Sequence, residues 1–217
     1  NGATLNNSGT TTLAGYNAGN ALTATGLNNT AYGYSALAAT TNNSGCVAVG
    51  YNSALSATDA GALSPTRGYI TAIGHHALKG TTTVGAVTAV GGFAGENNTT
   101  GASNTYVGYG SGRIGTTAGS NTAVGYYALY NNTAASCTAV GQNALVSSTG
   151  TQNTALGAAS GPGAITGTNL TMLGYGATPS STSATNEITL GNASVTKFRI
   201  PGLNFSIKNS TATDNHV

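Results

Sequence analysis

Small and apolar residues recur at fixed places along almost the whole chain. The recurring pattern reads Thr-Ala-Val-Gly, then two variable residues, then Ala or Ser. Successive pattern glycines are 16 to 18 residues apart, except for one gap of 24 residues. A fixed period of this length indicates a stack of repeating units. The eleven glycines are Gly15, Gly33, Gly50, Gly74, Gly91, Gly108, Gly125, Gly141, Gly157, Gly174 and Gly191.

The alternation within each copy predicts a β-strand with two different faces. In the copy Thr122-Ala123-Val124-Gly125, Thr and Val share one face, and Ala and Gly share the other. The Val column is the natural core. The Ala/Gly face has almost no side-chain volume, so another backbone can approach it, from a neighbouring turn, sheet or chain. The alternative is that these small residues fill a narrow solenoid interior.

The length of the repeat predicts the fold class. Seventeen residues are too few for a strand-helix unit, and clusters of Asn, Gly, Ser and Thr such as 42–45 and 97–101 are turn signals. We expect two short strands per repeat, the first being Thr-Ala-Val-Gly-Tyr and the second including the following Ala-Leu or Ser-Gly. The prediction is an all-β parallel roll or solenoid of about eleven turns, forming a rod on the order of 50 Å long.

Composition predicts self-association. Only 5% of the 217 residues are charged, against about 25% in an ordinary soluble domain. The net charge of +2 is too small to indicate nucleic acid or an anionic membrane as a partner. No apolar run is long enough for membrane insertion. Because few lysines protect the sheet edges, we expect the chain to pair with itself, as a homotrimer or a filament.

Two pairs of chemically active residues give no site. Cys46 and Cys137 occupy equivalent positions five turns apart, which is roughly 24 Å along the rod. A disulfide needs Cα atoms within about 7 Å, so both are predicted to be small buried residues. His75 and His76 are adjacent and would point to opposite faces of a strand, so a metal site there would need the axis of a trimer. We expect no metal and no cofactor.

Tyrosine follows the repeat glycine in six copies, giving a second column. Such a column is typical of either a ladder for stacking sugars or packing at a corner or between chains, and the packing interpretation is favoured. Tyr109 and Tyr126 are taken as candidate partner contacts. The six are Tyr16, Tyr34, Tyr51, Tyr109, Tyr126 and Tyr175.

Two breaks in the repeat suggest specific contacts. An insertion at 57–67 contains Asp59, Pro65 and Arg67, and is either a receptor contact or a tolerated loop. The repeat region spans 1–191, and the segment 192–217 is predicted to be a C-terminal cap. The residues expected to close the core are Val195, Phe198, Ile200, Leu203, Phe205 and Ile207. The candidate cap or assembly contacts are Lys197, Phe198, Arg199 and Phe205.

Ten Asn-x-Ser/Thr sequons occur, which become glycosylated only in a secreting host that attaches N-glycans. The possible acceptors include Asn28, Asn42, Asn97, Asn131, Asn169 and Asn192.

The repeat resembles that of a known family. The copies at 120–125 (Ser-Asn-Thr-Ala-Val-Gly) and 152–157 (Gln-Asn-Thr-Ala-Leu-Gly) are similar to the head repeat of YadA-like trimeric autotransporter adhesins. The likeness spans roughly 10–191 and implies a left-handed parallel β-roll that packs as a trimer. The segments 187–196 and 199–203 resemble the distal ends of phage tail fibres, cyanophages especially, which reuse this roll. Two features depart from the adhesins: the turn is slightly longer, and no coiled-coil stalk or membrane anchor follows.

These observations lead to three hypotheses of function. The first is a non-catalytic, extracellular or virion-surface fibre that attaches to a host glycan or other surface receptor by multivalent contact. The second is a subunit of a head-to-tail extracellular filament. The third is an ice-binding solenoid, which requires a flat, solvent-exposed Thr face; the phase of Thr with Val predicts that Thr faces inward. An enzyme is not expected, because no catalytic set of residues recurs.

Overall fold

Parallel strands make up the regular structure of the chain. The computed structural model describes residues 11–22, 26–41, 43–57, 69–82 and 85–199. Within these ranges the chain forms thirteen short strands and no helix. Eleven of them form one parallel sheet, and β9 (Ser147–Ser148) and β11 (Ala164–Ile165) form a second, two-stranded one. The eleven are β1 (Thr12–Ala14), β2 (Thr30–Tyr32), β3 (Val47–Val49), β4 (Ile70–Ile73), β5 (Val87–Val90), β6 (Thr105–Val107), β7 (Thr122–Val124), β8 (Thr138–Val140), β10 (Thr154–Leu156), β12 (Thr171–Leu173) and β13 (Ile188–Leu190).

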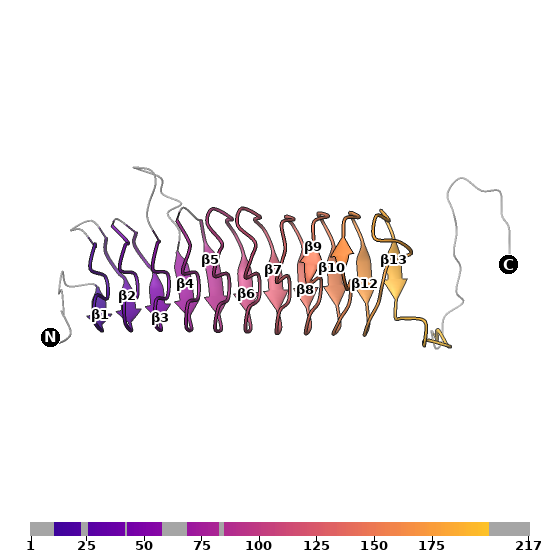
Figure 1. Ribbon diagram of the computed structural model, residues 1–217, viewed down its shortest axis with the longest axis horizontal. Coiled ribbons are helices and arrows are strands. Elements are labelled where there is room, and N and C mark those ends of the chain that lie inside the picture. Colours follow the sequence, from indigo (N-terminus) through magenta and orange to yellow (C-terminus); the bar gives the residue numbers. More distant parts are fainter. Residues whose placement is uncertain (1–10, 23–25, 42, 58–68, 83–84, 200–217) are drawn as a thin grey trace.

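The strands follow one another along the length of an elongated molecule, in sequence order (Figure 1). Each turn of the chain adds one strand to the sheet, and the repeat columns stay in register. Thr122 pairs with Thr138 and Val124 pairs with Val140, for example. The chain is therefore an all-β solenoid, as the repeat predicted.

The 24-residue gap between Gly50 and Gly74 leaves the sheet intact. On either side of it Val47 pairs with Thr71 and Val49 with Ile73, in the register of every other turn. The extra residues therefore form an excursion from one turn. Asp59, Pro65 and Arg67 lie outside the described residues, so their predicted role in receptor binding stays a prediction.

The prediction of a second strand in every repeat is wrong. The Ala-Leu segment after each glycine forms a turn in which Leu takes a positive φ, such as 50° at Leu129 and 46° at Leu145. Both leucine side chains are fully buried. Their N–H groups donate to the next turn, from Leu129 to the carbonyl of Ala144 at 3.0 Å. Burial and this hydrogen bond offset the left-handed conformation, which costs about 1–2 kcal/mol in a non-glycine residue.

The predicted orientation of the strands is also wrong. The Ala column faces inward and the Thr and Val columns face outward: Ala123 is fully buried, whereas Ile73 and Leu156 are 39% and 51% exposed. The reason is space, because the turn places Leu129 opposite the strand and leaves room only for a methyl group. The alternative interpretation, that small residues fill a narrow interior, is the correct one for Ala.

Glycine at the end of each strand permits close stacking of the turns. Gly125 has a φ of 134°, and a Cβ atom there would lie 2.6 Å from the carbonyl oxygen of Gly141. A neighbouring backbone therefore does approach the glycine, and it belongs to the next turn of the same chain.

Side-chain volume is exchanged between two positions inside the solenoid. Three strands carry a large inward residue in place of Ala, and the facing Leu position is then Gly. A Cβ atom on Gly112, for example, would lie 2.2 Å from the ring of Tyr106. The matched sets are Leu13 with Gly19, Tyr106 with Gly95 and Gly112, and Met172 with Gly161.

Buried asparagines bridge successive turns. The Asn121 side chain accepts a hydrogen bond from the N–H of Cys137 at 2.8 Å and donates to the carbonyl of Ala134 at 3.0 Å. Asn29, Asn104 and Asn153 make equivalent contacts. Cys46 and Cys137 occupy the same column, and both thiols are buried and form no disulfide, as predicted. Burial raises the pKa of the Cys137 thiol.

The segment that follows β13 does not resemble a packed cap where it is described. Residues 193–199 are exposed and contain no strand. Val195 and Phe198, two of the residues expected to close the core, are 54% and 64% exposed. Phe205 lies outside the described residues. No helix in the described ranges is long and apolar enough to cross a lipid bilayer.

Candidate functional site

The outward side of the main sheet is a long uncharged surface, which we call the sheet face. It consists of the Thr and Val columns of the eleven strands, and none of its residues is charged. Strand side chains there are half-buried or exposed, with Ile73, Val107 and Leu156 among the exposed apolar ones. An extended apolar surface of this kind is typical of a place where a partner binds. Its nine threonines are Thr12, Thr30, Thr71, Thr88, Thr105, Thr122, Thr138, Thr154 and Thr171.

Aromatic rings form a ladder along the corner that follows the repeat glycines. Seven rings in successive turns lie 5.1 to 5.6 Å apart between centroids. The Tyr–Tyr neighbours are stacked with interplanar angles of 11° to 20°. Stacking covers the faces of the inner rings and leaves their edges exposed, which favours corner packing over sugar stacking for that part of the column. The seven are Tyr16, Tyr34, Tyr51, His75, Phe93, Tyr109 and Tyr126.

His75 and His76 do not point to opposite faces, as their adjacency had suggested. They lie in the turn after β4 rather than on a strand, and His76 has a φ of 58°. Their rings stack with centroids 4.0 Å apart. The described residues contain no cluster of three or more His, Cys, Asp or Glu side chains able to hold a metal ion.

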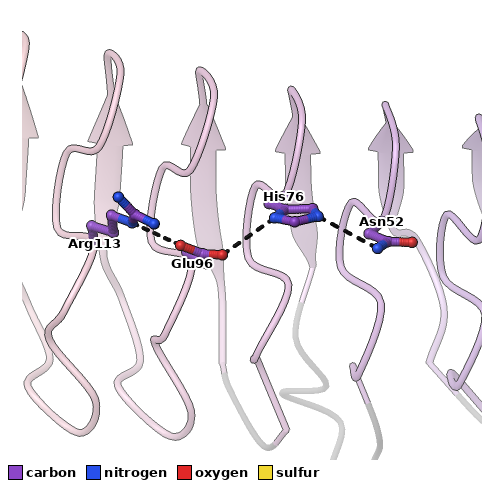
Figure 2. Close-up of polar contacts among 4 residues, drawn as sticks. All are labelled: Asn52, His76, Glu96 and Arg113. Atoms are coloured by element: carbon purple, nitrogen blue, oxygen red, sulfur yellow. Dashed lines mark hydrogen bonds and ion pairs between the residues drawn. The ribbon is translucent and has the colours of Figure 1, made fainter.

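Four side chains from four consecutive turns form a polar row beside the ladder (Figure 2). Glu96 is central: its Oε2 accepts a hydrogen bond from Arg113 Nε at 2.7 Å, and its Oε1 lies 3.3 Å from His76 Nδ1. On the other side, His76 Nε2 lies 3.4 Å from the Asn52 amide nitrogen. The row therefore holds an Arg–Glu ion pair that is only 28% and 12% exposed at its two side chains.

The electrostatics of this row follow from its partial burial. The hydrogen bond to Glu96 raises the pKa of Arg113, which remains fully charged. Its guanidinium also lies 4.5 Å from the centroid of the Phe93 ring, a cation–π contact. Burial lowers the pKa of His76, and the nearby His75 and Lys79 lower it further, so His76 is neutral near pH 7.

The ladder broadens at its C-terminal end into a cluster of tyrosines. The Tyr127 ring lies 4.1 Å from that of Tyr126 and 4.6 Å from that of Tyr130. Tyr127 fills the space above Gly110, where a Cβ atom would lie 2.5 Å from the ring. The next turn carries Gln142 and Asn143 at the ladder positions, so the stack of rings ends here.

The structure brings together only part of the predicted site. Tyr109 and Tyr126 belong to the ladder, beside Arg113 and Glu96. Lys197, Phe198 and Arg199 are exposed on the segment beyond β13, far along the chain from that corner. Of the sequons, Asn42 lies outside the described residues. Asn192 is half-buried, and the exposed ones are Asn28, Asn97, Asn131 and Asn169.

Sequence reasoning missed the polar row and the tyrosine cluster. Lys79, Glu96, Arg113 and Tyr130 are each separated by 17 residues, so they occupy one column of the repeat. That equal spacing was the signal that could have found them. A comparison with protein-family models, curated proteins and solved structures finds no match for the chain.

Proposed function

We propose that this protein is the non-catalytic head of an extracellular or virion-surface fibre, and that it attaches to a host by multivalent contact as a homotrimer. The observation that carries the proposal is the sheet face, which runs the length of the solenoid without a charged residue. Such a surface is stable in water when it is covered, and a second and third copy of the chain offer a surface of the same length and period.

Attachment follows from the trimer and not from a deep pocket. Three copies of each weak surface site raise the overall avidity without a new contact in any one site. The resemblance of the repeat to trimeric adhesin heads and phage fibres supports this function. It also implies a left-handed roll, a capped C-terminal end and a viral host-attachment role.

The test is the mass of the native assembly. Light scattering or native mass spectrometry should give three times the chain mass of 21.1 kDa. Replacing Val124 and Val140 on the sheet face by Lys should yield monomers, because unpaired charges would be buried between the chains. Asn131→Lys, an exposed change away from this face, is the matched control and should leave the trimer intact. A stable wild-type monomer would overturn the proposal, and fibrils seen by negative-stain microscopy would support the filament instead.

Ice binding is a second candidate, and the outward Thr columns favour it. This hypothesis was disfavoured on sequence because Thr was expected to face inward. Nine threonines instead lie on the outer side of a regular parallel sheet, with Val, Ile or Leu in the parallel column at most turns. Hydroxyl and methyl groups repeated at the strand spacing, roughly 4.8 Å, could order water on that face.

The two candidates need the same face in different states, so one sample separates them. A monomer that shows thermal hysteresis, lost in Thr122→Lys, supports ice binding. A trimer without thermal hysteresis supports the fibre.

A further inference from the structure

We propose that the corner patch formed by Phe93, Glu96, Arg113, Tyr126, Tyr127 and Tyr130 binds an acidic glycan, a polymer of pyranose rings that carry carboxylates. This inference rests on the proposed attachment function and names the surface site and the ligand class for it.

The distribution of charge sets this corner apart. The described residues include six Lys, Arg, Asp and Glu side chains, and three of them occupy one repeat column here: Lys79, Glu96 and Arg113. An isolated surface ion pair contributes only about 0–1 kcal/mol, so stability alone is a weak reason to place these charges together. Glu96 neutralises one of the two cations, which leaves the column with one net positive charge.

Arg113 is held in a position to bind a carboxylate. Its Nε donates to Glu96 at 2.7 Å, and its guanidinium lies over the Phe93 ring at 4.5 Å. Within the described residues its two Nη groups make no hydrogen bond. A guanidinium that is already oriented loses little conformational entropy on binding, and its planar pair of donors matches a carboxylate.

The aromatic cluster supplies the apolar half of the site. The inner rings of the ladder are covered on both faces by their neighbours, but no ring follows Tyr126 in the next turn. Tyr127 and Tyr130 widen this end of the ladder next to Arg113. The C–H face of a pyranose ring is apolar and packs on aromatic side chains, while its hydroxyl and carboxylate groups take the polar contacts. Tyr and Arg are also the residue types that dominate binding surfaces.

The repeat spacing suits a polymer lying along the rod. One turn advances the column by roughly 4.8 Å, close to the length of one pyranose ring. Lys79 lies two turns before Arg113 in the same column and can meet a second carboxylate of the chain. A neutral glycan would use the rings but would leave both cations without a partner.

The test is binding of an alginate hexasaccharide, which has one carboxylate per ring, to the native protein by isothermal titration calorimetry. Maltohexaose, a neutral hexasaccharide, is the ligand control and should bind at least ten-fold more weakly. Arg113→Gln and Tyr127→Asn should each weaken alginate binding by ten-fold or more. Asn is chosen because Asn52 and Asn143 already adopt the left-handed conformation at the position equivalent to Tyr127. Tyr34→Ala, at the far end of the same ladder, is the protein control and should bind as the wild type does.

Each outcome decides the proposal. Equal alginate binding by the wild type and both variants overturns it, as does the absence of binding or equal binding of maltohexaose. Cell attachment is measured in parallel on the same variants. Attachment that survives in Arg113→Gln and Tyr127→Asn, together with unchanged alginate binding, refutes this site and leaves the attachment function standing. Loss of alginate binding in the variants of a protein that attaches to no cell supports the site and refutes the host-attachment function.

Discussion

At the scale of single residues, the interior of this solenoid is filled by a trade of volume between two positions. A turn accepts Ala on the strand with Leu across from it, or a large strand residue with Gly across from it. Tyr106 is the extreme case, because its buried ring occupies the space of two missing leucines, above Gly95 and Gly112. Burial raises the pKa of the Tyr106 phenol well above its ordinary value. Its ring therefore acts as a filler and not as a titratable group.

This trade predicts a non-additive pair of substitutions. Tyr106→Ala should cost about 3–5 kcal/mol of unfolding free energy, because it empties a large part of the core. Gly112→Leu alone should also destabilise, because the new side chain clashes with the Tyr106 ring. The double variant should be more stable than the sum of the two losses, since it restores the Ala-and-Leu arrangement of other turns. Urea unfolding of all four proteins measures the coupling, and strict additivity would contradict the trade.

The repeat glycine makes a second prediction at this scale. Gly125→Ala should be strongly destabilising, because the new Cβ atom would lie 2.6 Å from the carbonyl oxygen of Gly141. Gly163→Ala is the matched control: its φ of 79° is also positive, but no atom lies within 4 Å of the added Cβ. The control should cost only about 1 kcal/mol, from backbone strain. Thermal melts compare the two, and equal losses would show that the contact between turns is not the cause.

At the scale of the turn, the polar row links three coils through groups that titrate differently. His76 is the sensitive member, because burial lowers its pKa below the usual value of about 6.5. The unfolded chain then binds a proton more readily than the folded one, so stability is full above pH 6.5 and falls as the pH drops through that value. His75 and Lys79 oppose protonation of His76, and Glu96 favours it.

The expected result is a smaller loss of stability on acidification in His76→Asn than in the wild type. Asn is neutral at every pH and is already present at the equivalent position 52, where it adopts the same backbone conformation. Urea midpoints at pH 7.5 and 5.5 provide the comparison. An identical pH dependence in the two proteins would mean that His76 does not carry it.

The elements show what the sequence could and could not predict. The period revealed one strand per turn, the parallel stack and the absence of a disulfide. It did not reveal which side of the strand faces inward, because Val on one face and Ala on the other fit either answer by hydrophobicity. Volume decided it, since Leu129 and Leu145 fold back across the strand and leave room only for Ala. Reading that fold-back requires recognising Leu in a left-handed conformation, which local propensity disfavours.

The same reasoning explains the fate of the candidate site. Tyr109 and Tyr126 were visible as a column because six tyrosines share it. The neighbouring column of Lys79, Glu96, Arg113 and Tyr130 mixes four residue types, so no composition count reveals it. Only the fold shows that residues 17 apart lie next to one another at this corner.

At the scale of the molecule, each turn contacts mainly its two neighbours, so whole turns should be removable. Deleting residues 126–141 joins Gly125 to Gln142 and brings Asn153 and Leu145 to the places of Cys137 and Leu129. We expect a folded protein with a lower m-value in urea, because less surface is exposed on unfolding. Deleting residues 126–133, half a turn, is the control and should abolish cooperative unfolding. A well-folded half-turn variant would contradict the repeat as the structural unit.

The direction of the hydrogen bonds has a mechanical consequence. Because the strands lie across the rod, the bonds between turns run along it, and a pull between its ends loads every interface in series. The weakest interface then limits the whole chain, however many turns it contains. Lateral partners change this, because chains bound side by side share the load at each level and a break in one is bridged by the others. A slender fibre under tension would gain its toughness from companionship more than from length.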